Sequence, residues 1–427
     1  MAKLAINGGK PCVTKRGRVQ WPVTTETDAK HVAEVVRHPK GNWCRLSPGD
    51  DEVTNFEKEW AAFQDAKYAL LINNGTVAIE CGLQALGIKP GDEVIVPAIT
   101  FIASASGVLM ARGLPVFADV DPKTCQIDAK DIEQKITKRT TGIVVVHYGG
   151  YPANMTAIKK VAKKHGLFVF EDCAHAHGTQ WKGRRVGAIG DCGSFSFQGS
   201  KSLTAGEGGA IVTNRRDVLD ACWAYHTIGR SLGSEKYEHE IVGPNLRVSE
   251  IQAAVLRTQL KKLPGQNKKR NENAAILRAG LKEVPGVVPL KEDKRVTDRG
   301  YYYFVMLMDE ATWGVKKATL LQAFNAEGLR IGSGYSRPVY RTKVFANNQF
   351  DATGWPTAGR DAYGPTMSYD KVCCPVAEDI AFHRQLTLGT HDLLSKQRVN
   401  GVLRIFKKLW KNRAELQEFE KKQAASA

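Results

Sequence analysis

Short apolar segments alternate with amphipathic ones between residues 52 and 213. The short segments are apolar throughout, which is typical of strands that are covered on both faces. We predict strands at residues 68–72, 93–96, 115–120, 142–147, 167–170, 194–197 and 210–213. Apolar positions recur at helical spacing between them, and we predict helices at residues 77–86, 103–110, 129–136 and 156–165. The alternation predicts an α/β fold with a mostly parallel central sheet.

The two ends of the chain follow other patterns. Glycine and proline interrupt residues 1–50, which predicts an irregular arm with one short helix near residues 27–37. A long helical pattern runs from residue 249 to residue 281, and an aromatic strand at residues 301–308 and two further helices near residues 317–326 and 393–410 follow. We therefore predict an arm at residues 1–50, a large domain at 51–280 and a smaller α+β domain at 281–427.

Composition and charge narrow the class of protein. The net charge of +17 is spread along the whole chain, which favours solvated helix faces over a nucleic-acid surface; steering of an anionic substrate stays open. No apolar run is long enough to cross a bilayer, and the N-terminus has no signal-peptide pattern. The nine cysteines are scattered without a C-x-x-C motif, as reduced thiols would be. We expect a cytoplasmic protein without nucleic-acid or membrane partners.

The strongest candidate chemistry lies at two strand ends. Asp172 ends one predicted strand, and Lys201 follows a second strand 29 residues later. Ligands of open α/β sheets bind at the carboxyl ends of the strands. A pyridoxal-phosphate enzyme needs an imine-forming lysine and a carboxylate that keeps the pyridine nitrogen protonated, and this pair meets both requirements. Taken alone, Asp172 is better explained as a turn or cap residue.

Other segments supply candidates for the remainder of such a site. Gly75 and Thr76 open a predicted helix directly after a strand, where backbone N–H groups can hold a phosphate. Phe101 follows another strand and can stack on a ring, although a core aromatic is the simpler interpretation of its spacing. Cys173, His175 and His177 alternate as metal ligands on a strand would, but only three ligands cluster and we expect no metal.

Several motifs in a fixed order resemble the DegT/StrS-type sugar aminotransferases, a family of fold type I pyridoxal-phosphate enzymes. The resemblance is strong over residues 50–262 and weak elsewhere. Its motifs are NGT (74–76), PGDEVIVP (90–97), VFADVD (116–121), EDCAHAHG (171–178), FSFQ (195–198), KSLTAGEGG (201–209) and GPNLRVSEIQAA (243–254).

The resemblance implies pyridoxal 5′-phosphate as the cofactor and a homodimer with active sites shared between its subunits. Lys201 would form the Schiff base, and Asp172 would pair with the pyridine nitrogen. The resemblance also implies that the phosphate is bound by Gly75, Thr76, Ser196 and the partner's Asn245. It implies that the ring is contacted by Phe101, Ala174 and His175. His175 stands where most members have Gln, and with residues 41–45 it resembles the 3-amino-5-hydroxybenzoate synthase branch.

The resulting hypothesis is a transaminase that moves an amino group from Gln or Glu to a keto-sugar or keto-cyclitol in two half-reactions. Substrate contacts are expected from polar residues that could equally be structural: His226, Tyr340, Arg341, His383 and Arg384. An aromatising enzyme similar to 3-amino-5-hydroxybenzoate synthase also keeps the lysine and is the alternative. A DNA-binding regulator that uses the same fold is disfavoured, because no helix-turn-helix segment precedes it.

Overall fold

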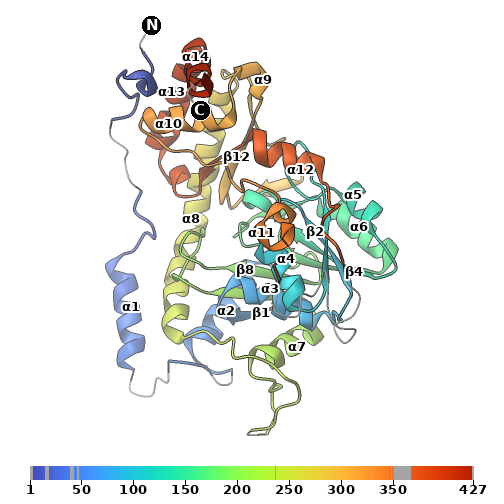
Figure 1. Ribbon diagram of the computed structural model, residues 1–427. Coiled ribbons are helices and arrows are strands. Elements are labelled where there is room, and N and C mark those ends of the chain that lie inside the picture. The colour runs from blue at the N-terminus through green and yellow to red at the C-terminus, as the bar shows by residue number, and fades with distance from the viewer. Residues whose placement is uncertain are drawn as a thin grey trace.

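The computed structural model describes residues 3–14, 19–38, 43–45, 48–235, 237–347, 349–350 and 367–425. Its centre is a seven-stranded sheet in the order β1-β9-β8-β5-β4-β2-β3 (Figure 1). The strands are β1 (Tyr68–Ile72), β2 (Glu93–Pro97), β3 (Leu114–Ala118), β4 (Thr140–Val146), β5 (Phe168–Asp172), β8 (Cys192–Ser196) and β9 (Gly209–Thr213). Five neighbouring strands from β8 to β3 are parallel, whereas β9 is antiparallel to β8 and β1. The predicted mostly parallel α/β sheet is confirmed.

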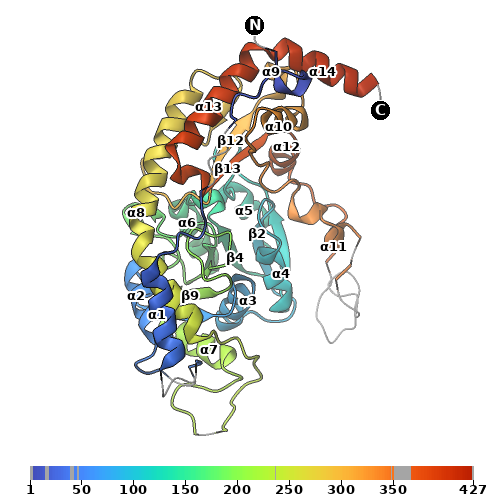
Figure 2. The same cartoon turned by 90° about the vertical axis from the view of Figure 1, so that its left-hand side faces the viewer.

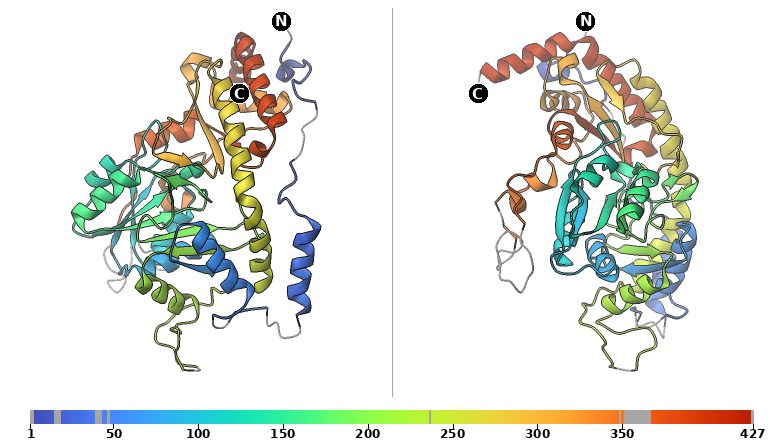
Figure 3. Two further views of the ribbon diagram at one scale, coloured as in Figure 1. Left: turned by 180° about the vertical axis from the view of Figure 1, so that it is seen from behind. Right: turned by 90° about the vertical axis from the view of Figure 1, so that its right-hand side faces the viewer.

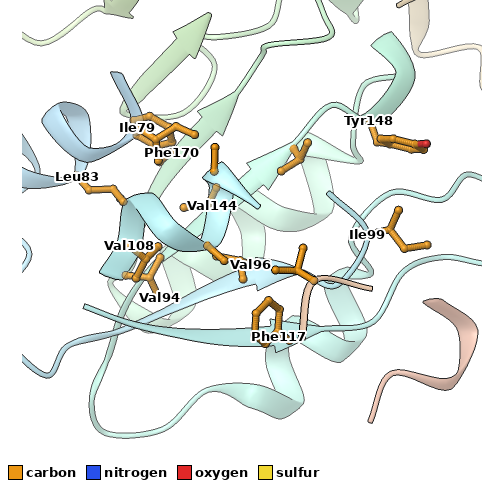
Figure 4. Packing of buried hydrophobic residues seen from close by; sticks show 14 of the residues in the cluster. Ile79, Leu83, Val94, Val96, Ile99, Val108, Phe117, Val144, Tyr148 and Phe170 are labelled. Carbon is orange, nitrogen blue, oxygen red and sulfur yellow. The ribbon is translucent and has the colours of Figure 1, made fainter. Parts of the chain in front are cut away.

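Helices cover both faces of this sheet. They are α2 (Glu52–Phe63), α3 (Gly75–Ala85), α4 (Ala103–Met110), α5 (Ala129–Lys135), α6 (Met155–His165), α7 (Arg216–His226) and α8 (Glu250–Leu281). Successive strand residues point to opposite faces, so Val94 and Val96 pack in one core cluster and Ile95 in the other. Figure 4 shows the first cluster, in which Ile79 of α3 and Val108 of α4 lie against the sheet. Burial on both faces explains why the strands are apolar throughout.

The C-terminal part forms a second, smaller unit around a three-stranded antiparallel sheet in the order β10-β12-β13. Its strands are β10 (Val287–Pro289), β12 (Tyr303–Met308) and β13 (Gln385–Gly389). Its helices are α9 (Glu310–Trp313), α10 (Lys317–Ala326), α11 (Lys343–Ala346), α12 (Pro375–Asp379), α13 (Lys396–Lys411) and α14 (Arg413–Ala425), with a π-helical turn at Ile380–Arg384. In a small third sheet, β11 (Val296–Asp298) pairs with β6 (Gln180–Trp181), which in turn pairs with β7 (Arg184–Arg185).

Helix α8 connects the two units as one continuous element (Figures 1 and 2). Leu256 and Leu263 pack in the core of the large sheet, whereas Leu277 and Leu281 pack in the C-terminal core. Pro264 lies inside the helix near the midpoint. The boundary near residue 280 stays a prediction, since α8 passes from one core to the other before it.

The N-terminal arm runs along both units. A short 3₁₀ turn (Ala5–Asn7) follows Leu4, which is buried in the C-terminal core. Helix α1 (Glu26–Arg37) lies beside α8, as Figure 3 shows from behind, and Lys262 forms an ion pair with Asp28. None of the helices in the described ranges combines the length and the apolarity that a bilayer crossing requires.

Candidate active site

A cavity of about 770 Å³ opens at the carboxyl ends of the parallel strands. Six stretches of the large unit line it, together with three tyrosines that follow β11 in the sequence. The described residues around it are Asn73–Val77, Ile79, Thr100, Phe101, Ala103, Val146, Asp172, Ala174, His175, Ser196, Gln198, Ser200, Lys201, Glu207, Tyr302, Tyr303 and Tyr335. Lys201 and Asp172 therefore face the same cavity, which is where strand ends in an open sheet place a ligand.

Lys201 follows β8 at a tight turn, in which its backbone N–H donates to the carbonyl of Gln198 at 2.9 Å. Its Nζ lies 4.5 Å from the centroid of the Tyr302 ring. Burial lowers the pKa of the Lys201 ammonium from its ordinary value, and the nearby Tyr302 and Asp172 only partly oppose this shift. A larger fraction of the side chain is therefore the neutral, nucleophilic amine.

Asp172 ends β5 and is held by donors on both carboxylate oxygens. Ser104 Oγ donates to Oδ2 at 2.7 Å, and the backbone N–H of Ala174 donates to Oδ1 at 3.1 Å. Ser104 is in turn 2.8 Å from Thr100 Oγ1. These bonds fix the orientation of an acid that is 5% exposed.

The start of α3 forms a cradle for an anion. Asn74 caps the helix by accepting the N–H of Val77 at 3.1 Å, and Gly75 and Thr76 are the first helical residues. A Cβ on Gly75 would lie 2.7 Å from Ser196 Cβ, so only glycine allows the end of β8 to approach this closely. The free N–H groups and the positive end of the helix dipole suit a phosphate.

His175 lies in a stack of aromatic rings. The backbone N–H of Gly149 donates to its Nδ1 at 3.3 Å, which leaves the ring proton on Nε2, 3.4 Å from Tyr335 Oη. Its ring stacks on Tyr302 with centroids 4.0 Å apart and an interplanar angle of 17°. Burial and the positive charge of Lys201 hold the pKa of His175 well below its ordinary value, so the ring is neutral.

Sequence reasoning missed the tyrosines at 302, 303 and 335, which form the wall opposite the strand ends. The aromatic strand was predicted, but consecutive tyrosines in a strand alternate between faces and are easily interpreted as core. It also missed Trp21, whose Nε1 donates to the carbonyl of Gly199 at 3.1 Å. The N-terminal arm thus contacts the turn that carries Lys201.

Most of the predicted cofactor contacts line this cavity: Gly75, Thr76, Phe101, Asp172, Ala174, His175, Ser196 and Lys201. Asn245 does not, since it lies exposed at the end of the segment that follows α7. Of residues 41–45, Gly41 and Asn42 lie outside the described residues.

None of the five expected substrate contacts lines this cavity. Tyr340 Oη and Arg341 both bind Glu378, each at 2.7 Å. His383 and Arg384 line a separate hollow with Glu310 and Asp379. His226 is 1% exposed and packs at the end of α7. Nearby acidic side chains or packing contacts position these five residues. The residues next to them in the sequence gave no sign of these contacts.

The Cys173–His175–His177 alternation is divided between different environments. His177 Nε2 lies 2.9 Å from the carbonyl of Ser196, and His175 faces the cavity. Cys173 instead lies near His147 and Glu171, with ligand atoms within 4.8 Å of one another. His147 binds Glu171 at 3.0 Å, and the same carboxylate accepts the backbone N–H groups of Gly187, Ile189 and Gly190. These bonds already use the polar atoms, so we interpret the group as structural.

Comparison with known proteins identifies the family. Residues 25–407 match the sequence model of the DegT/DnrJ/EryC1/StrS aminotransferase family. A protein of Micromonospora echinospora, provisionally named an L-glutamine:3-amino-2,3-dideoxy-scyllo-inosose aminotransferase, is 37% identical over 92% of this chain and 93% of its own. The 3-amino-5-hydroxybenzoate synthase of Amycolatopsis mediterranei is 36% identical over 76% of this chain and 83% of its own.

Solved structures agree. A crystal structure of 3-amino-5-hydroxybenzoic acid synthase has a TM-score of 0.80 and 32% identity, covering 91% of this chain and 97% of that one. An aminotransferase from Psychrobacter cryohalolentis has a TM-score of 0.81 and 32% identity, covering 92% and 99%. The chain belongs to the DegT/DnrJ/EryC1/StrS aminotransferase family. It is a transaminase of fold type I with pyridoxal phosphate as its cofactor.

The chemical groups that line the cavity match those that this cofactor requires. A phosphorylated pyridine aldehyde requires an anion cradle, an amine and an acid, and these are present at the start of α3, at Lys201 and at Asp172. The close approach of Gly75 to Ser196 is the most specific feature, since a single added carbon would close the cradle.

Proposed function

We propose that this enzyme transfers an amino group from L-glutamine to a keto-cyclitol. The names of relatives that match most of this chain support this substrate pair, including the L-glutamine:2-deoxy-scyllo-inosose aminotransferase of Streptoalloteichus tenebrarius, which is 36% identical over 80% of the chain. The site observation that carries the proposal is the shared cavity of Lys201 and Asp172 at the cradle of α3. The tyrosine wall adds hydroxyl groups and flat apolar faces, which suit a polyhydroxylated ring.

Each cofactor contact has a proposed role. Gly75, Thr76 and Ser196 hold the phosphate, and Asp172 holds the protonated pyridine nitrogen. Phe101 and Ala174 would contact the ring, and His175 would donate a hydrogen bond to the cofactor from Nε2. When bound, pyridoxal phosphate supplies an electron sink that lowers the cost of removing a proton from the substrate carbon.

Lys201 has two tasks in this proposal. Its Nζ would hold the cofactor in the resting enzyme, and its free amine would accept and return the proton of the substrate carbon. Its lowered pKa suits the second task, because a base that is already neutral can accept the proton. The hydrogen bonds from Ser104 and Ala174 would hold the Asp172 side chain in one orientation at the pyridine nitrogen.

We further propose that the enzyme is a homodimer in which Asn245 reaches the phosphate of the partner's site. Asn245 is exposed, and residues 241 and 242 beside it expose apolar side chains, Val242 to 97%. Such apolar exposure suits a surface that a second copy covers. The nine free cysteines are compatible with a reducing, cytoplasmic compartment.

The test is an absorbance titration of the purified enzyme with a panel of amino donors, with a keto-cyclitol then added as acceptor. We expect an imine absorbance band at about 410 nm, which L-glutamine bleaches and the acceptor restores. Lys201→Ala should lack this behaviour, and the surface variant Lys89→Ala should retain it. An enzyme that instead releases an aromatic, ultraviolet-absorbing acid from an amino-ketocyclohexane acid would replace this proposal by the synthase alternative.

A further inference from the structure

The cavity is poor in positive charge for an enzyme whose proposed donor is an amino acid. Among the described residues that line it, Lys201 is the only cationic side chain, while Asp172 and Glu207 are both acidic. Lys201 is engaged by the cofactor chemistry, so it cannot also serve as a fixed partner for a carboxylate. The α-carboxylate of glutamine therefore requires a cation from outside this lining.

Unused positive charge lies at the base of a projecting segment, residues 228–243, which extends away from the body beside α7 (Figures 1 and 2). The base is closed by a bridge between Thr227 and Asn245 and by a hydrogen bond of 3.1 Å from Ile228 N to Pro244 O. Leu246 O accepts the backbone N–H of Asn73 at 2.9 Å, and Asn73 belongs to the cavity rim. The base is thus held beside the site.

Three polar atoms at this base are shielded from solvent without a hydrogen-bond partner among the described residues. They are Arg230 Nε, Arg247 Nη1 and His226 Nε2. Burial lowers the pKa of Arg247 from its ordinary value; Cys44 opposes the shift, and the like charge of Arg230 adds to it. Leaving buried donors of two neighbouring cations unpaired is costly, so an anion is the expected complement.

The neighbouring acids are already committed to other groups. Glu240 accepts hydrogen bonds from Ser231 and Ser234 at 2.6 and 2.9 Å. Glu57 forms the ion pair with Arg45. Neither arginine has an ion-pair partner in the part of the chain that the structure describes, and neither lines the cavity of its own subunit.

We propose that Arg230 and Arg247 of one subunit bind the α-carboxylate of the amino donor in the partner subunit's cavity. Arg247 is two residues from Asn245, and its backbone N–H donates to the Asn245 side chain at 3.2 Å, so both would enter the partner's site together. The planar guanidinium groups match a carboxylate in geometry. The proposal rests on the proposed homodimer and on an amino-acid donor.

The first experiment titrates the holoenzyme with L-glutamine and follows bleaching of the cofactor band. For Arg247→Ala we expect an unchanged band before addition and about a 10- to 100-fold higher glutamine concentration at half-bleaching, because a charge-assisted contact is lost. The matched control is Arg216→Ala, an exposed arginine paired with Asp220. Bleaching of Arg247→Ala at the wild-type concentration would overturn the proposal.

A modified donor tests the carboxylate itself. Wild type should strongly prefer L-glutamine over its α-carboxamide, which lacks the negative charge, and Arg247→Ala should lose this preference. Calorimetry gives the same comparison without turnover. It measures the affinity for glutamine of the Lys201→Ala variant and of the Lys201→Ala/Arg247→Ala double variant, both in the presence of cofactor. An equal preference for glutamine in wild type and Arg247→Ala would contradict carboxylate binding by Arg247.

Mixed dimers test whether the contact crosses between subunits. Lys201→Ala and Arg247→Ala homodimers should both be impaired, whereas a dimer of one subunit of each should regain one complete site. This recovery also shows that the Arg247→Ala subunit is folded. An impaired mixed dimer would assign Arg247 to its own subunit and overturn the proposal. A wild-type protein that is monomeric by sedimentation, or that lacks the cofactor band, would instead contradict the proposed function.

Discussion

The two sides of the cavity are built in different ways. The cofactor side comes from strand ends and the helix start of a single sheet, so Asp172, Ser196 and Gly75 are positioned by backbone geometry within residues 68–213. The opposite wall comes from Tyr302 and Tyr335, which belong to the later part of the chain. One side therefore depends on the register of a buried sheet, and the other on how two units pack. This difference suggests that chemistry and substrate choice can be altered separately.

The strongest test of the cofactor side is Lys201→Ala. We expect turnover to fall by about 10⁴-fold or more, since the variant loses the nucleophile and the proton carrier together. Single-turnover kinetics with glutamine measure the loss. If turnover fell less than tenfold, Lys201 would not be the catalytic amine.

A smaller change on the same side is Gly75→Ala. Its Cβ would lie 2.7 Å from Ser196 Cβ, and moving the end of β8 should weaken cofactor binding by about 10- to 100-fold. Equilibrium dialysis of pyridoxal phosphate gives the affinity. Gly166→Ala is a useful comparison, because no other atom lies within 4 Å of the position where its Cβ would be, although its positive φ adds some strain. Equal affinities in Gly75→Ala and wild type would argue against the cradle.

Acid should destabilise the cofactor side through His177. Burial, with Lys201 adding to it, lowers the pKa of His177 to about 3, so the folded ring stays neutral where the unfolded ring is protonated. The unfolded state then binds more protons, and the free energy of unfolding falls as pH decreases from about 6.5 toward 3, by up to about 1.4 kcal/mol per pH unit for this group. Urea denaturation at several pH values measures the slope. His177→Gln, whose side-chain amide can replace Nε2 as the donor to Ser196 O, should reduce this dependence, and an unchanged slope would contradict it.

The weakest effect is expected on the tyrosine wall. Tyr303→Phe should leave cofactor binding and the glutamine half-reaction unchanged, while weakening the acceptor by about 3- to 10-fold through one lost hydrogen bond. Separate half-reaction kinetics distinguish the two. A matching loss in the glutamine half-reaction would show that the two sides are not independent.

The same division explains what the sequence could and could not predict. The strand at Tyr68–Ile72 and the helix at Ala103–Met110 agree with the predicted ranges, because buried strands and amphipathic helices have clear local periods. Strand β13 was missed, since Gln385 and Thr387 interrupt its apolar pattern although both are buried. These two side chains are buried because β13 pairs with β12. The paired residues are about 80 positions apart in the sequence, so no local pattern reveals the pairing.

The site divides along the same line. Asp172 and Lys201 could be found because each ends or follows a strand and the two chemistries complement each other. The family resemblance then supplied roles for their neighbours. Tyr335 carries no such local signal, and the ion pair between Arg341 and Glu378 depends on a fold that spacing alone does not encode.

The 32 residues of α8 make a rod of about 48 Å at 1.5 Å per residue. One end is fixed in the core beneath the cofactor side, and the other is fixed in the core that supports the tyrosine wall. Any change in how the two units are placed relative to each other must then either bend this rod or slide side chains along it. Pro264 provides a compliant point for bending, because it leaves the carbonyl of Leu260 without its helical amide partner.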